Sequence, residues 1–194
     1  MYVGGIKSFD ALSETAGKDV SAYYTEQGLL YDQEELKRAY QDYADHKGGA
    51  KFHSRTVGQE ISPTAFSDRV MYFLTSVTLP VDGNISTEMR LGAAFDRETG
   101  AYLNAFDLFS CGQAEILPRI LTTAEISDLA LQAEIKAAFQ PEYITFFPNH
   151  LEISFPEGTL ASQEYSYQIV LNYDEKLTSV LHDWAIPRSS MPQK

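Results

Sequence analysis

The sequence RVMYFLTSVTLPVDGNISTEMRLGAAF occupies residues 69–95 and decides the fold class. Its first part, Arg69 to Leu79, is a continuous apolar, β-branched and aromatic run ended by Pro80, which predicts a long strand. Asp82-Gly83-Asn84 has the composition of a turn, and Thr87 to Phe95 predicts a second strand. We therefore expect two neighbouring antiparallel strands joined by this turn.

Helical sequence follows on the C-terminal side of this hairpin. Asp96 to Gly100 (DRETG) predicts a turn, and Gly112 to Phe139 is the largest helical block. Its first apolar face comprises Ile116, Leu117, Ile120 and Leu121. Thr122 with Glu125 resembles a capping box that starts a second helix, which Pro141 closes. The expected apolar face of this second helix comprises Ile126, Leu129, Ala130, Ala133 and Ala137.

The C-terminal third returns to strand sequence. Tyr143 to Phe147 and Leu151 to Phe155 flank Pro148-Asn149-His150, which is the composition of a hairpin. The next strand is predicted to have one buried and one wet face, because polar residues alternate with Tyr165, Tyr167, Ile169 and Leu171. Asp174 to Leu181 predicts a last short helix.

The N-terminal part has weaker periodicity. A strand is expected around Val20 to Thr25, within a weakly structured or edge-strand segment of residues 1–30. Asp32 starts an amphipathic helix that Gly48-Gly49 ends, and Lys51 to Val57 predicts a short strand. The apolar face of the helix comprises Leu36, Ala39, Tyr40 and Tyr43.

The order of these elements predicts an α+β fold with a mostly antiparallel sheet and two or three helices packed on one face. Residues 31–187 form a single domain in this interpretation, and residues 188–194 form a tail.

Composition and net charge exclude several classes of partner and of protein. The 194 residues carry 27 acidic and 15 basic side chains, a net charge of −12, which argues against nucleic acid and anionic membrane surfaces as partners. The aromatic content of 12% argues against a disordered acidic tail. The sequence has no apolar run long enough to span a bilayer and no signal-peptide pattern near Met1.

No catalytic, cofactor-binding or metal-ligating residue is predicted. His46, His53, His150 and His182 lack metal-ligand spacing, and no nucleophile elbow, Walker loop or dinucleotide fingerprint occurs. Cys111, the single cysteine, lies near an expected helix start but has no nucleophile signature around it.

Carboxylates and tyrosines are the remaining candidates. Two facing carboxylates can hydrolyse glycosides, but close pairs in so acidic a chain are usually a solvated face. The pairs are Glu34-Glu35, Asp42 with Asp45, Asp96 with Glu98, and Asp174-Glu175. We expect Tyr40, Tyr43, Tyr165 and Tyr167 to lie in the core. For Tyr23 and Tyr24, the sequence does not decide between the core and a contact surface.

From about Met71 onward, the order of motifs resembles the RsiV-like domain family. The similar motifs are Gly83-Asn84, the run Gly92 to Gly100 (GAAFDRETG), Asp107-Leu108-Phe109, Phe147 to Glu157 (FPNHLEISFPE) and Ile169 to Leu177 (IVLNYDEKL). Two positions depart from the family pattern. A Gly-Gly-Ala-His run is replaced by Leu79 to Asp82, and Asn172 stands where the family prefers Pro. A role tied to the missing His is therefore not carried over.

The resemblance implies a non-catalytic binding or sensing domain outside the cytoplasm, of the kind found in bacterial anti-sigma factors and beside peptidoglycan deacetylases. Its expected ligand is a lysozyme-like protein or a cell-wall glycan, and no cofactor is expected. Loops on a rigid sheet are where recognition usually occurs. We therefore expect contacts at Asp82 to Ser86 and Phe155 to Glu164.

Two alternatives stay open. One is a carboxylate-based hydrolase of cell-wall sugars, which would need two acids at the base of one cleft. The other is a cytosolic acidic interaction protein, because no signal peptide precedes the domain. The ligand and the oligomeric state are not fixed by the sequence.

Overall fold

The computed structural model describes residues 12–49, 57–80 and 86–188. Its helices and strands are α1 (Glu14–Gln27), α2 (Gln33–Lys47), β1 (Gly58–Phe66), β2 (Val70–Pro80), β3 (Ser86–Asp96), β4 (Tyr102–Leu103), α3 (Gln113–Thr123), α4 (Leu129–Ala138), β5 (Ile144–Phe146), β6 (His150–Phe155), β7 (Tyr167–Asn172) and α5 (Glu175–Thr178). Short 3-10 turns are η2 (Ala105–Leu108), η3 (Pro141–Tyr143) and η4 (Asp183–Ala185). Among these residues, no helix is long and apolar enough to cross a bilayer.

The strands form two antiparallel sheets, ordered β1-β2-β3-β4 and β5-β6-β7, which confirms the α+β prediction. The predicted hairpin is confirmed too: β2 and β3 pair without a register break from Val70 opposite Asp96 to Pro80 opposite Ser86. The Asp82-Gly83-Asn84 turn lies outside the described residues, as does the expected strand at Lys51 to Val57 except for its last residue.

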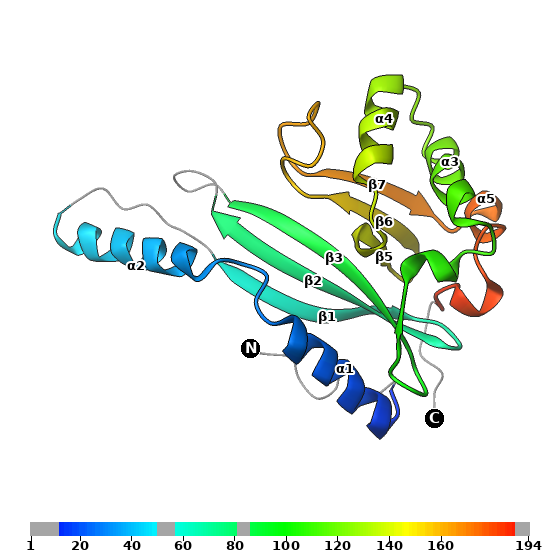
Figure 1. The fold of residues 1–194 in the computed structure, drawn as a ribbon, viewed down its shortest axis with the longest axis horizontal. Coiled ribbons are helices and arrows are strands. Elements are labelled where there is room, and N and C mark those ends of the chain that lie inside the picture. Colours follow the sequence, from blue (N-terminus) through cyan, green and yellow to red (C-terminus); the bar gives the residue numbers. More distant parts are fainter. Residues whose placement is uncertain (1–11, 50–56, 81–85, 189–194) are drawn as a thin grey trace.

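The two sheets have helices on different sides (Figure 1). Side chains alternate along β2 and β3, as a period of two requires, and enter two separate cores. The smaller core, against α1, contains Val20, Tyr24, Ile61, Phe66, Met71, Phe73 and Phe95. The larger core, which includes α3, α4 and β5 to β7, receives Val70, Tyr72 and Ala94 from the opposite face. In place of one sheet with helices on one face, two sheets are stacked and α1 covers the outer face of the first.

Helix α1 replaces the strand expected at Val20 to Thr25, so that prediction is wrong. Ser13 caps the helix, because its Oγ accepts a hydrogen bond from the Ala16 amide at 3.1 Å. Ala16, Val20 and Tyr24 are all fully buried and follow one another at intervals of four residues. The β-branched and aromatic residues that favoured a strand form a narrow buried stripe of a helix instead, because tertiary packing overrides their propensity.

Helix α2 confirms the prediction from Asp32 to Gly48-Gly49, with Asp32 as its N-cap. Its apolar face, however, is open to solvent: Leu36, Tyr40 and Tyr43 are 44%, 73% and 47% exposed. The helix extends away from both sheets (Figure 1), and among the described residues neither core contains one of its side chains. The expectation that Tyr40 and Tyr43 lie in the core is therefore wrong.

Helix α4 begins later than the predicted capping box. Helix α3 continues to Thr123, and Glu125 then takes a left-handed backbone conformation with φ of 55°. Asp128 is the actual N-cap, since its Oδ1 accepts hydrogen bonds from two following backbone amides at 2.8 and 3.2 Å. Helix α4 therefore starts after the Asp128 cap and not at Thr122, where the capping box was expected.

The two sheets touch at Gly92 in β3. A Cβ added there would lie 1.9 Å from the carbonyl oxygen of Ile144 in β5. A register break in β1 lies beside Thr64, whose Oγ1 donates to the carbonyl of Phe146 at 2.7 Å. The rings of Tyr72 and Phe146 stack at 4.6 Å between their centroids. The backbone of one sheet therefore rests on the backbone of the other, which only glycine permits at this position.

The predicted turn from Asp96 to Gly100 is confirmed, and it joins the sheet to α1. Asp96 Oδ1 accepts from the amides of Glu98 and Thr99, both at 3.0 Å, and Oδ2 accepts from Arg69 Nε at 2.9 Å. Gly100 has φ of 77°, and a Cβ there would lie 2.8 Å from the Cα of Ala16 in α1. The turn therefore needs its glycine for both conformation and space.

We predict that Gly92→Ala destabilises the protein by about 3 kcal/mol or more, because the added methyl group meets backbone atoms that cannot rotate away. Gly17→Ala is the matched control: nothing lies within 4 Å of its added Cβ, and Gly17 is inside α1. It should stabilise by about 0.5–1 kcal/mol. Urea unfolding monitored through Trp184 fluorescence measures both. Equal effects of the two substitutions would contradict the direct contact of the sheets.

We predict that Asp96 makes stability depend on acid pH. Burial raises the pKa of this carboxyl, but the hydrogen bonds from Arg69, Thr99 and Glu98 outweigh it and place the net pKa below the ordinary value. The stabilisation is therefore present above an unfolded-state pKa near 3.8 and is lost as pH falls through the lower folded-state pKa. Asp96→Asn should lose about 1–3 kcal/mol at pH 7.

Urea unfolding at a series of pH values from neutral to acid measures this effect. The wild-type chain should lose more stability on acidification than the Asp96→Asn variant does, because the variant has no charge to neutralise. Parallel stability–pH curves for the two proteins would refute the assignment.

Candidate functional site

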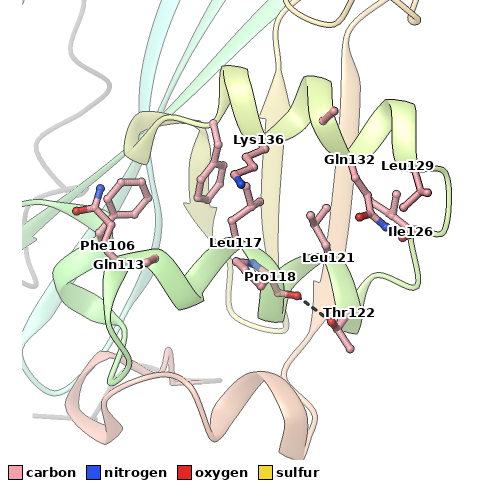
Figure 2. Close-up of a pocket in the computed structure, with 13 residues that line it drawn as sticks. Phe106, Gln113, Leu117, Pro118, Leu121, Thr122, Ile126, Leu129, Gln132 and Lys136 are labelled. Atoms are coloured by element: carbon pink, nitrogen blue, oxygen red, sulfur yellow. Dashed lines mark hydrogen bonds between the residues drawn. The ribbon is translucent and has the colours of Figure 1, made fainter.

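Helices α3 and α4 lie side by side and border an apolar groove with a volume of about 970 Å³ (Figure 2). Leu117 and Leu121 project into it from α3, Leu129 from the first turn of α4, and Ile126 from the segment between the helices. Leu129 is 77% exposed. Part of the apolar face predicted for the second helix thus lines an open groove, while Ile135 is the buried residue of α4.

The polar groups of the groove carry no negative charge. Lys136 points into it from α4, and among the described residues that line the groove none is Asp or Glu. Lys136 itself has no ion-pair partner among residues 12–49, 57–80 and 86–188. Gln132 is occupied locally, since its Nε2 donates to the carbonyl of Ile126 at 2.6 Å. In a chain of net charge −12, this is an apolar site with a cationic rim.

Pro118 adds a backbone acceptor to the groove wall. It lies inside α3 and has no amide hydrogen, so the carbonyl of Ala114 lacks the hydrogen bond that residue 118 would otherwise donate. The Pro118 carbonyl accepts from Thr122 Oγ1 at 2.8 Å (Figure 2). The arrangement can bind an apolar side-chain row whose flank carries a hydrogen-bond donor or an acid.

The loop between β6 and β7 is a second candidate surface. It covers 156–166, and the predicted contact segment Phe155 to Glu164 lies mostly within it. Leu160 is buried, and Glu134 of α4 accepts hydrogen bonds from the Ser162 amide at 2.9 Å and the Ser162 hydroxyl at 3.0 Å. The loop is therefore held in one conformation against α4. The other predicted contact segment, Asp82 to Ser86, lies outside the described residues except for Ser86.

Tyr165 stands at the end of this loop with 63% of its surface exposed, which corrects the expectation that it lies in the core. The neighbouring Glu164 carboxylate and, more weakly, the charge of Glu157 raise the pKa of Tyr165. Tyr167, two residues on, is half-buried as the first residue of β7. The alternating pattern predicts a buried Tyr165 only if the strand includes residue 165, whereas β7 begins at Tyr167.

The two tyrosines left open by the sequence belong to the smaller core. Tyr24 is fully buried, and Tyr23 stacks on Tyr102 with ring centroids 5.3 Å apart. Burial, with the nearby charges of Tyr23 and Glu142, raises the pKa of Tyr102 to about 12. These aromatic rings fix α1 to the sheet.

A buried ion pair links the two sheets. Arg90 Nε of β3 donates to Glu152 Oε1 of β6 at 2.7 Å, and Ser154 Oγ donates to the same oxygen at 2.7 Å. The side chains of Arg90 and Glu152 are 19% and 9% exposed. Because the acid is paired with a guanidinium, the pair binds β3 to β6 and does not form the two-acid geometry of a glycosidase.

Several of the carboxylates singled out from the sequence have local partners. Glu34 forms an ion pair within α2, Asp45 accepts from Gln41 at 2.7 Å, and Asp174 caps α5. Asp96 is occupied in the turn already described. None of these residues lines the α3–α4 groove.

The histidines are spread over the molecule. His46 lies in α2, His150 stacks on Phe147 at 4.6 Å and His182 stacks on Trp184 at 5.2 Å. His53 lies outside the described residues. Within the described part of the chain, no three His, Cys, Asp or Glu side chains are grouped to hold a metal ion. Cys111 is a half-buried free thiol just before Gly112, the N-cap of α3.

The comparisons with known proteins give likenesses to solved structures alone. No protein-family model matches the chain, and no curated protein matches it. One solved structure, described as a DUF3298 family protein from Pseudomonas aeruginosa PAO1, is 15% identical with a TM-score of 0.42. The match covers 68% of this chain and spans 65% of that chain.

Proposed function

We propose that the chain is a non-catalytic binding module of the RsiV-like kind, displayed outside the cytoplasm of a bacterium, and that it binds a basic protein such as a lysozyme. The observation that carries the proposal is the β6–β7 loop, an acidic loop held against α4 with an exposed tyrosine at its end. The motif resemblance from Met71 to Leu177 supports the choice of family.

The loop has the properties of a recognition surface. Tyr165 offers a large amphipathic ring, a residue type enriched at protein interfaces. Glu157 and Glu164 lie beside it, and the two hydrogen bonds from Ser162 to Glu134 fix the loop before a partner arrives. A loop that is already ordered loses less conformational entropy on binding.

Charge favours a basic partner. The chain has a net charge of −12, so a basic protein is attracted over long range and associates faster at low salt. A cell-wall glycan is the second ligand class, since an exposed tyrosine ring can stack on a sugar. Neutral glycans would bind with little dependence on salt, and this difference separates the two ligand classes.

We predict salt-sensitive binding of a lysozyme to the full chain. Glu157→Gln with Glu164→Gln should weaken binding about five- to tenfold at low salt, and Tyr165→Ala should weaken it about tenfold or more. Titration calorimetry at low and moderate salt measures the affinities.

The control is Glu26→Gln with Glu60→Gln, which removes the same two charges from exposed positions on α1 and β1. This control should keep most of the affinity if the loop is the contact surface. Absence of lysozyme binding, or an equal loss in both double variants, would reject the proposal. Salt-insensitive binding to peptidoglycan fragments in its place would move the ligand to a glycan.

A further inference from the structure

Strand β7 forms an open edge of the second sheet. It pairs with β6 on one side, and none of the strands that the structure describes pairs with its other side. Alternate residues of such a strand direct their N–H and C=O groups away from the sheet. Apart from the ladder with β6, no backbone hydrogen bond among the described residues reaches the main chain of Tyr167 to Leu171. We infer that an extended segment of a partner protein pairs with this side of β7, the β7 edge, as a further antiparallel strand.

The other edges of the two sheets have features that prevent such pairing. Strand β1 contains Glu60 and Pro63, and its register breaks beside Pro63. Strand β4 has only two residues. Strand β5 has three, and the carbonyl of Phe146 in it accepts a hydrogen bond from Thr64 of the first sheet.

Strand β7 has none of these features. Its six residues (YQIVLN) include no proline, glycine or charged side chain, and they pair with β6 without a register break. Among the strands that the structure describes, the β7 edge is therefore the one best suited to receive another strand.

Helix α4 extends beyond the β7 edge. In both views α4 crosses the second sheet, and its N-terminal part projects past β7 (Figure 1 and Figure 2). Ile135, in the C-terminal half, is the buried residue of α4, whereas Leu129 in the first turn is 77% exposed. A strand added at the usual spacing of about 4.8 Å from β7 would lie next to this N-terminal part. The helix that covers the sheet is thus long enough to cover one more strand.

The side chains of β7 determine which segment fits. Ile169 and Leu171 are buried in the larger core, and Val170 on the opposite face is 56% exposed. Apolar and β-branched residues in a neighbouring strand stabilise such positions through cross-strand pairs. Gln168 and Asn172 share the face of Val170 and are uncharged. The matching segment therefore has about six uncharged residues, rich in Val, Ile and Thr, and spans roughly 20 Å.

Charge restricts the ends of this segment. Glu157 and Glu164 lie in the loop before β7, and Asp174 and Glu175 follow the strand, with Lys176 next in the chain. The net charge of −12 has the same sign. An acidic segment is therefore repelled, whereas an uncharged segment with basic residues at its ends is attracted.

The test uses a synthetic peptide of this chemistry, Lys-Thr-Val-Thr-Ile-Thr-Val-Lys, with N-methyl groups on alternate residues. One edge of this peptide can still pair, while the blocked edge prevents the peptide from stacking on itself. The control peptide has the same sequence with N-methyl groups on both edges. Fluorescence anisotropy of the labelled peptides with the full chain should show saturable binding of the first peptide. Binding of the control should be about tenfold weaker or less, because its ladder hydrogen bonds are lost.

Val170→Lys tests the site on the protein. A lysine on an edge strand is a device by which natural sheets avoid pairing, so this variant should weaken peptide binding about tenfold or more. Tyr40→Lys is the matched control, because Tyr40 is 73% exposed on α2 and the variant adds the same charge. It should bind the peptide as the wild type does. Circular dichroism with Trp184 fluorescence confirms that both variants fold.

Amide hydrogen exchange locates the bound peptide. In the free chain, the amides of β7 that point away from β6 should exchange faster than those in the ladder. A saturating amount of peptide should slow these outward amides about tenfold or more. The protection should therefore appear with a period of two along Tyr167 to Asn172, a pattern that binding elsewhere would not produce.

Three results would overturn the inference: no saturable binding of the first peptide, equal binding of the two peptides, or equal binding to Val170→Lys and Tyr40→Lys. Protection of the outward amides that rises with protein concentration in the absence of peptide would assign the edge to a second copy of the chain and reject a partner segment. The inference does not rest on lysozyme binding by the β6–β7 loop, and no lysozyme enters these measurements, so the two proposals fail separately.

Discussion

The contact between the backbones of β3 and β5 at Gly92 is the constraint on which the rest of the structure depends. With no side chain between them, the second sheet lies directly against the first, and the Arg90–Glu152 pair and the Tyr72–Phe146 stack form around this crossing. The position of β5 and β6 determines where α3 and α4 pack, because both helices share the larger core with these strands. Gly92 therefore determines the positions of both the α3–α4 groove and the β6–β7 loop.

The run from Gly92 to Gly100 has an architectural explanation at four of its positions. Gly92 admits β5, Phe95 fills the smaller core, Asp96 accepts hydrogen bonds that close the turn, and Gly100 admits α1. A motif of this kind indicates a fold. It carries no information about a ligand, which is why recognition has to be sought in loops and exposed faces that such motifs leave free.

Patterns with strong local signals predicted the structure well. The long β2–β3 hairpin, the β5–β6 hairpin, the turn at Asp96, the start of α2 at Asp32 and the short helix after Asp174 all follow from the residues in them. Helix α1 was missed because its buried stripe is only one side chain wide and is built from residues that also suit strands. The start of α4 was missed because the left-handed conformation of Glu125 has no signature in a non-glycine residue.

The sequence predicted only part of the candidate surfaces. The loop after Phe155 was expected on general grounds, but the exposure of Tyr165 depends on where β7 begins. The apolar faces of α2 and α4 were both predicted. Elements far apart in the sequence decide whether such a face packs against a core or is exposed to solvent. The periodicity of one helix does not show where those elements lie in the fold.

The separation of the two cores also determines which part of the fold can unfold first. They lie on opposite faces of β2 and β3 and have no side chain in common. The outer layer, α1 with its aromatic contacts, can therefore detach as a cooperative unit while the two sheets, α3 and α4 remain packed. A domain built in this way would yield under mechanical pull or protease attack from its N-terminal side first, and the α3–α4 groove and the β6–β7 loop would be the last to be lost.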